Sequence, residues 1–496
     1  MNLLEWDEVM NLMWFRSDLR LHDNPALFHA MKNGPTIAVY FVTKDQWQKH
    51  NIAPIKQDFI LRQLLALSNG LAELNVPLIV LDAKDFSGVI PLLKNMCENH
   101  NIKQIFFNEE YEWNEQQLSE QVYANLTTLG RLVYRYHDQC LIAPGEIRNK
   151  QGGFYKVFTA FKKAYLQALP ESGRPLYPKP NKQDTKNIQA IKENRDQYLL
   201  DKLSSDESLK TKEEWKDSWP AGEDHALKRL SEFANGYMED YQENRDYPSI
   251  QGTSKLSAYM AIGAVSVRQC YQEANNLKGL ESTGVDTWIN ELIWRDFYRH
   301  LMAAYPEICR YKPFKPHTDQ LPWNQANSLF EAWCKGKTGY PLVDAAMRQL
   351  LETGWMHNRL RMVTAMFLTK HLFVDWRLGE QFFMQHLIDG DMASNNGGWQ
   401  WSASTGVDAV PYFRIFNPTR QSQRFDANGD FIRKYVPELK SLDNKSIHQP
   451  SKQQIMQCGY VAPIVDHKLA VAQTKQHFKQ LSELQTHFEP AEYGLS

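Results

Sequence analysis

Five short apolar runs in the first 136 residues constrain the fold of this chain more than any other feature. They lie at residues 12–15, 36–42, 78–81, 105–107 and 132–136, with starts 24 to 42 residues apart. This spacing leaves room for a helix between successive runs, such as residues 59–74, which is the rhythm of βαβ units. The sequence therefore predicts an α/β domain over residues 10–138, built on a doubly wound parallel sheet.

The pattern beyond residue 224 is helical. Apolar residues recur with helical spacing from Thr287 to Leu301, from Leu342 to a stop at Gly354, and over residues 358–372. A chain of 496 residues exceeds the size of one ordinary core, so a second domain is expected. We predict an all-α domain over residues 224–485.

Residues 139–223 are predicted to connect the two domains. In the stretch 179–216, 17 of 38 residues are charged, and apolar periodicity is weak before Trp215. This composition is typical of a solvated connector.

Several classes of protein are disfavoured by the sequence. No apolar run approaches the roughly 18 residues of a membrane span, and the N-terminus carries Glu5, Asp7 and Glu8 where a signal peptide would be basic. The six cysteines form no C-x-x-C pair, so neither a disulfide framework nor a metal site is expected. The formal net charge of −2 means that a polyanion would have to meet a local basic patch. We expect a cytoplasmic protein.

The chemistry-bearing residues concentrate in the second half of the chain. Eight of the 14 tryptophans fall within residues 288–401. The dinucleotide fingerprints G-x-G-x-x-G and G-x-x-x-x-G-K-[ST] are absent. The hexapeptide 252–257 opens a helix with three hydroxyls and a lysine, which suits either a diphosphate or a plain helix cap.

Two further segments combine polar groups with indoles. Glu291 and Trp294 lie one helical turn apart and share a face, which fits either a binding site or a helix edge whose aromatic ring enters the core. Residues 387–401, expected to form a loop, crowd two acids, three amides and three glycines against two indoles. That density of polar groups indicates a polar ligand or mutual hydrogen bonds.

Arginines in the same half are interleaved with aromatic residues. Arg245 precedes Tyr247, Arg414 stands between Phe413 and Phe416, and residues 359, 361 and 424 follow the same pattern. Each arginine alone fits a solvated helix face. Together they favour phosphate contacts with base stacking, and hence a nucleic acid partner.

Long motifs in these segments resemble the photolyase and cryptochrome family, specifically its class I cyclobutane pyrimidine dimer photolyases. The motifs are WINELIWRDFYRHL at 288–301, GYPLVDAAMRQLLETGWMHNRLRM at 339–362 and IDGDMASNNGGWQW at 388–401. The stretch from Trp14 to Asn24 resembles the family's opening strand and loop, and the similarity extends over about residues 12–470.

The resemblance implies a blue-light flavoprotein enzyme that splits pyrimidine dimers in DNA. It places FAD in the helical domain. Asn395 stands where the family has a residue facing flavin N5, and its carboxamide adds no negative charge there. The matching FAD positions are Tyr241, Thr253, Ser254, Lys255, Leu256, Ser257, Trp288, Arg361, Asp389, Gly390, Asp391 and Asn395.

The resemblance also assigns the substrate and an electron relay. Glu291 would hydrogen-bond the flipped dimer, Trp294 and Trp401 would stack on it, and Met362 would pack beneath it. Trp323, Trp376 and Trp399 would carry electrons from the surface to the flavin, with Trp323 in an exposed stretch. The positions matching substrate or DNA contacts are Arg245, Glu291, Trp294, Asn358, Arg359, Met362, Trp401, Arg414 and Gln421.

A few positions indicate the subfamily and the antenna. Photolyases specific for (6-4) lesions carry histidine at the place of Asn358, and the DASH group carries tyrosine at the places of Trp294 and Trp401. A methenyltetrahydrofolate antenna is expected, although Arg310 replaces the family's lysine; a deazaflavin or an empty pocket are the alternatives. The matching positions are His50, Asn114, Glu115 and Cys309.

Two other functions compete with repair. A cryptochrome-type blue-light receptor usually carries a long C-terminal extension, whereas about 30 residues follow the last matching segment here. A light-independent flavoprotein oxidoreductase would need a nicotinamide site, for which the sequence has no fingerprint. We expect a monomer that associates with the nucleoid when it binds DNA.

Overall fold

The computed structural model describes residues 10–170, 172–184, 213–277 and 283–488. The chain forms two compact units. The first contains Met1–Gln242, Thr253–Pro306 and Ile388–Asp391, and the second contains Glu243–Gly252, Glu307–Leu387 and Met392–Ser496. The domain boundaries 10–138, 139–223 and 224–485 stay a prediction, and residues 185–212 of the predicted connector lie outside the described residues.

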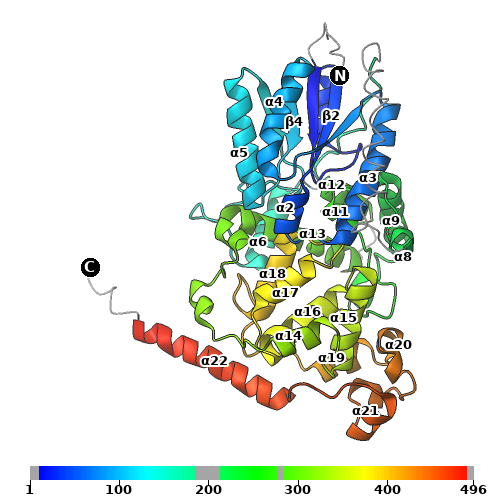
Figure 1. The fold of residues 1–496 in the computed structure, drawn as a ribbon, viewed down its shortest axis with the longest axis vertical. Coiled ribbons are helices and arrows are strands. Elements are labelled where there is room, and N and C mark those ends of the chain that lie inside the picture. The colour runs from blue at the N-terminus through cyan, green and yellow to red at the C-terminus, as the bar shows by residue number, and fades with distance from the viewer. Residues whose placement is uncertain (1–9, 171, 185–212, 278–282, 489–496) are drawn as a thin grey trace. The chain divides into compact units, whose positions relative to one another are not determined.

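The first unit is built on a five-stranded parallel sheet with the order β3-β2-β1-β4-β5 (Figure 1). All five strands lie within three residues of their predicted bounds. The chain order, which starts at the centre and moves first to one edge and then to the other, confirms the doubly wound fold. The strands are β1 (Met10–Phe15), β2 (Thr36–Val42), β3 (Leu78–Asp82), β4 (Ile102–Asn108) and β5 (Leu132–Tyr136).

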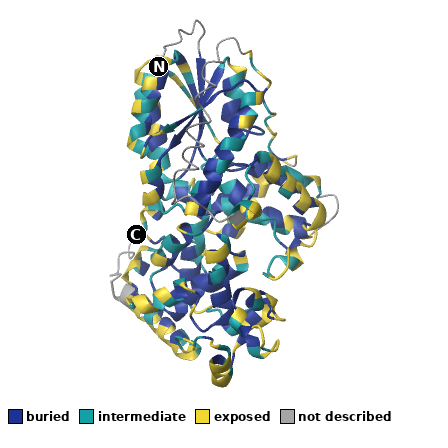
Figure 2. Cartoon of the chain, turned by 45° about the vertical axis from the view of Figure 1, so that its right-hand side comes forward, coloured by how far each residue is buried: buried dark blue, intermediate teal, exposed yellow. Residues whose placement is uncertain are grey.

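Helices cover both faces of this sheet. Apolar residues of α4 (Val89–Asn99) and α5 (Trp113–Thr128) pack with Leu12, Val39 and Ile105 on one face. On the opposite face lie α1 (Pro25–Lys32), whose Ala30 carbonyl accepts a hydrogen bond from Asn11, and α3 (Pro54–Glu73) (Figure 1). The central strands are buried on both sides (Figure 2), as parallel strands require.

Two further short helices of the first unit lie between strands in the chain, and its other helices follow β5. A buried ion-pair network ties the loop after β1 to one of them, because Arg268 contacts Asp23 at 2.9 Å and Asp138 at 2.6 Å. The elements are α2 (Lys44–Lys49), η1 (Phe86–Gly88), α6 (Phe158–Ala168), α8 (Glu213–Ser218), α9 (Glu223–Gly236), α10 (Tyr241–Asn244), which continues into the second unit, α11 (Ser257–Ala261), α12 (Val267–Asn276) and α13 (Thr283–Ala304).

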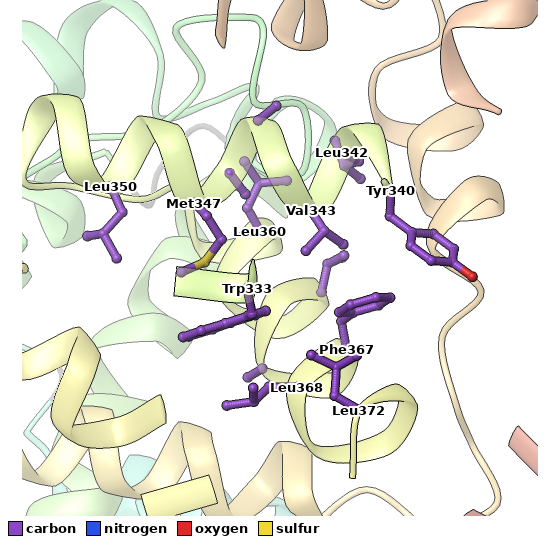
Figure 3. Close-up of a cluster of buried hydrophobic side chains, with 14 of the residues drawn as sticks. Trp333, Tyr340, Leu342, Val343, Met347, Leu350, Leu360, Phe367, Leu368 and Leu372 are labelled. Carbon is purple, nitrogen blue, oxygen red and sulfur yellow. The ribbon is translucent and has the colours of Figure 1, made fainter. Parts of the chain in front are cut away.

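All the regular elements among the described residues of the second unit are helices, and the core of this unit gathers around Trp333 (Figure 3). Leu342, Met347 and Leu350 of one helix face Leu360 and Phe367 of the next two elements. The elements are η5 (Pro306–Arg310), which begins on the last residue of the first unit, η6 (Pro316–Gln320), α14 (Asn327–Cys334), α15 (Pro341–Thr353), α16 (Asn358–Met366), the π-helix η7 (Phe367–His371), α17 (Trp376–Met384), α18 (Met392–Ala403), α19 (Pro418–Phe425), α20 (Asp430–Tyr435), η8 (Pro437–Leu439), η9 (Ser446–His448), α21 (Lys452–Cys458) and α22 (His467–Phe488).

Two local predictions have opposite outcomes in this unit. Gly354 ends α15 in the left-handed conformation, with φ of 68°, as the predicted stop requires. The expected loop over residues 387–401 is wrong from Met392 onward, because α18 begins there and includes all three amides and both indoles. None of the described helices is both long enough and apolar enough to cross a membrane.

Candidate functional site

The hydroxyl-rich hexapeptide lies in the first unit at the start of α11, apart from Gly252, which belongs to the second unit. Thr253, Ser254 and Lys255 are half-buried, Leu256 is buried, and Ser257 is exposed as the first helical residue. Lys255 adopts φ of 52°, a conformation that a residue with a Cβ rarely takes without a local reason. The hydroxyls of residues 253 and 254 and the Lys255 side chain therefore precede the helix.

Two predicted flavin-binding aromatics share a cluster in this unit. Tyr241 and Trp288 are both buried, and Phe233 of α9 lies next to each of them, with ring centroids 5.8 Å and 5.4 Å away. The structure thus brings residues of α9, α10 and α13 together.

The acidic segment Ile388–Asp391 also belongs to the first unit, although its flanks do not. Arg299 of α13 forms an ion pair with Asp391, and Lys56 of α3 donates a hydrogen bond of 2.6 Å to the carbonyl oxygen of Gly390. Burial disfavours the Arg299 cation, but Asp391 together with Cys140, Glu112 and Asp296 outweighs burial, and the pKa of Arg299 is raised. Sequence reasoning missed Lys56 and Arg299, because nothing local marks a contact across 334 or 92 residues.

Glu291 and Trp294 lie on α13 as predicted, and both are half-buried. Phe158 of α6 stacks on Trp294 with a centroid distance of 3.5 Å and an angle of 7° between the rings. One face of the indole is therefore covered by the protein itself, and the half-buried remainder is what a stacked base could reach.

A cavity of about 130 Å³ lies beside the sheet of the first unit, where β1 and β2 end. His50 and Glu115 line it, and His50 contacts Asn114 at 2.9 Å and Glu115 at 3.4 Å. Burial, with Glu112 and Glu110 nearby, raises the pKa of Glu115 well above its usual range, and burial lowers the pKa of His50. Three predicted antenna residues thus lie together, while Cys309 belongs to the second unit and is half-buried.

In the second unit, α16 packs against α18, and the predicted residues of both helices remain partly open. Arg361 and Met362 of α16 are half-buried, as are Asn395 and Trp401 of α18. Among the described residues, no heavy atom lies within 4 Å of the place where a Cβ on Gly398 would stand. Asn395 and Gly398 are three residues apart, so this side of α18 offers an amide beside an open surface, which fits a flat ring such as that of FAD.

A hydrogen-bond network lies beneath Asn395. Asn395 Nδ2 donates to the Glu380 carbonyl at 2.9 Å, Asn396 Nδ2 donates to Glu380 Oε1 at 3.0 Å, and Gln400 Nε2 donates to Asn396 Oδ1 at 2.9 Å. Burial raises the pKa of Glu380 to about 7. Sequence reasoning missed Glu380, which lies 15 residues before Asn395 in a different helix.

The three relay tryptophans belong to one hydrophobic cluster of the second unit. Trp323 lies in a stretch that reaches the surface, as predicted, since Pro322, Asn324 and Gln325 are exposed. The tryptophan itself is buried: it is 8% exposed, and its ring centroid lies 4.9 Å from that of Phe373. Trp376 is the first residue of α17.

The residues of the second unit that are predicted to contact DNA differ in their surroundings: one already has partners within the protein, and others are exposed. Arg359 pairs with Asp246 at 2.7 Å and lies 4.6 Å from the Phe425 ring, so its guanidinium already has partners. Arg414 and Asn358 are exposed, whereas Gln421 and Arg245 are half-buried.

Comparisons with known proteins give one consistent family. The family model described as DNA photolyase matches residues 11–181, and the model described as the FAD binding domain of DNA photolyase matches residues 288–480. A deoxyribodipyrimidine photo-lyase of Salmonella typhimurium is 44% identical over 471 residues, which cover 93% of this chain and 96% of the relative.

Solved structures agree with these matches. A class III photolyase from Agrobacterium tumefaciens has a TM-score of 0.82 at 32% identity, covering 97% of this chain and 99% of that one. A cryptochrome from Synechocystis has a TM-score of 0.81 at 30% identity, with coverages of 95% and 100%.

Proposed function

Because the chain belongs to the DNA photolyase family, we propose that it splits cyclobutane pyrimidine dimers in DNA with the energy of blue light. The observation that carries this proposal is the near full-length similarity to relatives named deoxyribodipyrimidine photo-lyase, at identities up to 44%. These relatives favour repair over the alternative of a blue-light receptor.

FAD, when bound and reduced, supplies the electron that opens the cyclobutane ring. Two sets of residues are proposed to bind it, one suited to its diphosphate and the other to its flat ring. In the first unit, the hydroxyls and lysine of residues 253–257 suit a diphosphate, and Asp389 suits a hydrogen-bonding edge. In the second unit, Asn395 offers its amide beside the open side of α18, and Arg361 offers a cation.

The dimer is proposed to contact α13, α16 and α18. The Glu291 carboxyl would hydrogen-bond the polar edge of the dimer, and the free part of the Trp294 ring would stack on one base. Trp401 and Met362, both half-buried, would supply further apolar contacts. Asn358 at this place supports the cyclobutane lesion over the (6-4) lesion.

DNA outside the lesion is proposed to meet arginines of the second unit. Arg414 is exposed and suited to a phosphate. Arg359 is proposed to act with Asp246 and Phe425, which fix its direction. Arg245 and Gln421 complete the set.

Two auxiliary roles are proposed for the remaining predicted residues. Trp323, Trp376 and Trp399 would relay electrons toward FAD, which their common cluster supports. His50, Asn114 and Glu115 would take part in an antenna site, which their mutual contacts and the adjoining cavity support. Cys309 of the second unit stays a predicted antenna residue. A methenyl folate is the proposed antenna.

The direct test is light-dependent repair of a defined oligonucleotide. Wild-type protein with reduced FAD should restore dimer-containing DNA under blue light, and should leave it unchanged in the dark. Glu291→Gln should bind FAD normally but split fewer dimers per absorbed photon, since it loses the ionisable carboxyl. Glu331→Gln, at an exposed pair with Lys335, serves as the control and should match wild type. Equal repair by Glu291→Gln would remove Glu291 from the proposed site.

A further inference from the structure

Lys56 occupies a place that is unfavourable for a cation. Lys56 is 9% exposed, and it is the third residue of α3, after Pro54 and Ile55. Burial disfavours a charged ammonium, and the N-terminus of a helix repels positive charge. Burial accordingly lowers the pKa of Lys56. Residues placed against such local rules tend to mark functional sites.

The surroundings of Lys56 offset these costs with groups from distant parts of the first unit. The ammonium donates a hydrogen bond of 2.6 Å to the carbonyl oxygen of Gly390. The carboxylates of Asp391, Glu112, Asp389 and Glu110 favour its charged form. Lysine is a donor only, so this contact orients the Gly390 carbonyl toward α3.

A second basic side chain holds the next residue of the same segment. Arg299, which is 3% exposed, pairs with Asp391. Two consecutive residues are therefore fixed by two buried cations, one from α3 and one from α13. Asp389 precedes them directly and is 6% exposed, so it is continuous with the main chain that they fix.

We propose that Lys56 is a positioning residue for FAD, which holds the Gly390 carbonyl and thereby sets the places of Asp389 and Asp391. The inference rests on the proposed role of this segment in FAD binding. Lys56 does not contact the cofactor in this account. Its effect passes through the main chain of the segment.

The test compares FAD release from three holoenzyme variants with release from wild type. Lys56→Met keeps the length of the side chain and removes its donors and charge. A hydrogen bond to a charged group is worth about 1.5–3 kcal/mol, so FAD should leave about 10-fold to 100-fold faster. Lys56→Arg keeps a charged donor and should recover most of the retention. Lys49→Met, at a 61% exposed side chain paired with Asp85, should release FAD as wild type does.

A second readout separates positioning from a general role in folding. Thermal unfolding of the FAD-free protein measures what the Lys56 contact contributes to folding itself, since removing one partner of a buried charged hydrogen bond leaves the other groups unpaired. The loss of FAD in Lys56→Met should exceed what that loss of stability accounts for. The visible circular dichroism of bound flavin should change in Lys56→Met and return toward wild type in Lys56→Arg.

Three results would overturn the inference. They are wild-type retention of FAD in Lys56→Met, an equal loss in Lys49→Met, and a loss of FAD that only parallels lower stability of the FAD-free protein. If Lys56→Met does not fold, Lys56→Gln takes its place under the same criteria. A wild-type protein that binds FAD but splits no dimers would contradict the proposed function and leave the Lys56 comparison intact.

Discussion

Glu380 is a buried carboxyl group whose ionisation opposes folding. Its side chain is 1% exposed, Oε1 accepts from Asn396, and Oε2 has no hydrogen-bond partner among the residues described. Burial raises its pKa to about 7; Asn396 and the Arg377 cation act in the opposite direction, and Asp375 adds to the rise. An unfolded glutamate titrates near 4.3, so between these values the folded chain keeps a proton that the unfolded chain loses.

The pH dependence of stability should therefore change in Glu380→Gln. As the pH rises from about 4.5 to 7, the Glu380 contribution lowers the free energy of unfolding by up to about 3 kcal/mol, and it stays lowered above pH 7. Glutamine cannot ionise and can still accept from Asn396, so the variant should lose this decline. Denaturant unfolding of the FAD-free protein at a series of pH values measures it, with Glu331→Gln as the exposed control. An unchanged pH profile in Glu380→Gln would show that Glu380 is already ionised in the folded protein.

Contacts between individual side chains were the feature that the sequence predicted least well. The flavin-binding and dimer-binding positions came from long motifs, whereas Lys56, Arg299 and Glu380 came from the structure alone. Their partners lie in other elements, 334, 92 and 16 residues away, and their own segments carry no unusual composition. Burial of a charge is a property of tertiary packing, which local patterns do not contain.

Gly379 of α17 and Gly398 of α18 have different surroundings. A Cβ on Gly379 would stand 2.2 Å from Trp399 Cη2 and 2.6 Å from Leu368 Cδ2, so only glycine lets the indole approach α17. Gly398 has open space beside it instead. Close packing explains why glycine occupies position 379. It does not explain the glycine at position 398, which stands on the open side of α18.

Alanine at these two positions should have opposite effects. Gly379→Ala should destabilise the FAD-free protein by about 1–3 kcal/mol, because the core must shift. Gly398→Ala should stabilise it by about 0.5–1 kcal/mol, as alanine does inside helices, yet bind FAD more weakly because the methyl occupies the open side. Thermal unfolding and FAD titration check both effects. Unaltered FAD affinity in Gly398→Ala would place the flavin ring elsewhere.

At the element scale, periodicity predicted more than composition did. The five strands, α13, α15 and α16 were found from apolar spacing, and the strands agree with their predicted bounds within three residues. Composition failed at residues 387–401, where glycines and amides indicated a loop and α18 formed. Tertiary contacts outweigh weak helix propensity there, since Asn396 and Gln400 hydrogen-bond along and beneath the helix.

Each unit of the molecule holds a segment whose flanking chain belongs to the other unit. Glu243–Gly252 lies in the second unit, where Arg359 holds Asp246, and Ile388–Asp391 lies in the first, where Lys56 and Arg299 hold it. Both segments carry proposed site residues, Arg245 in one and Asp389 and Asp391 in the other. Sequence patterns predicted an α/β part and a helical part, but not this exchange, which depends on contacts between residues far apart in the chain.

Light absorbed by bound, reduced FAD is proposed to drive dimer splitting. The most direct measurement is the rate of splitting per incident photon as a function of wavelength, on protein freed of any antenna. The expected spectrum follows the absorption of the bound reduced flavin, with no splitting in the dark. Splitting that proceeds equally in the dark, or no splitting under light absorbed by the reduced flavin, would contradict it.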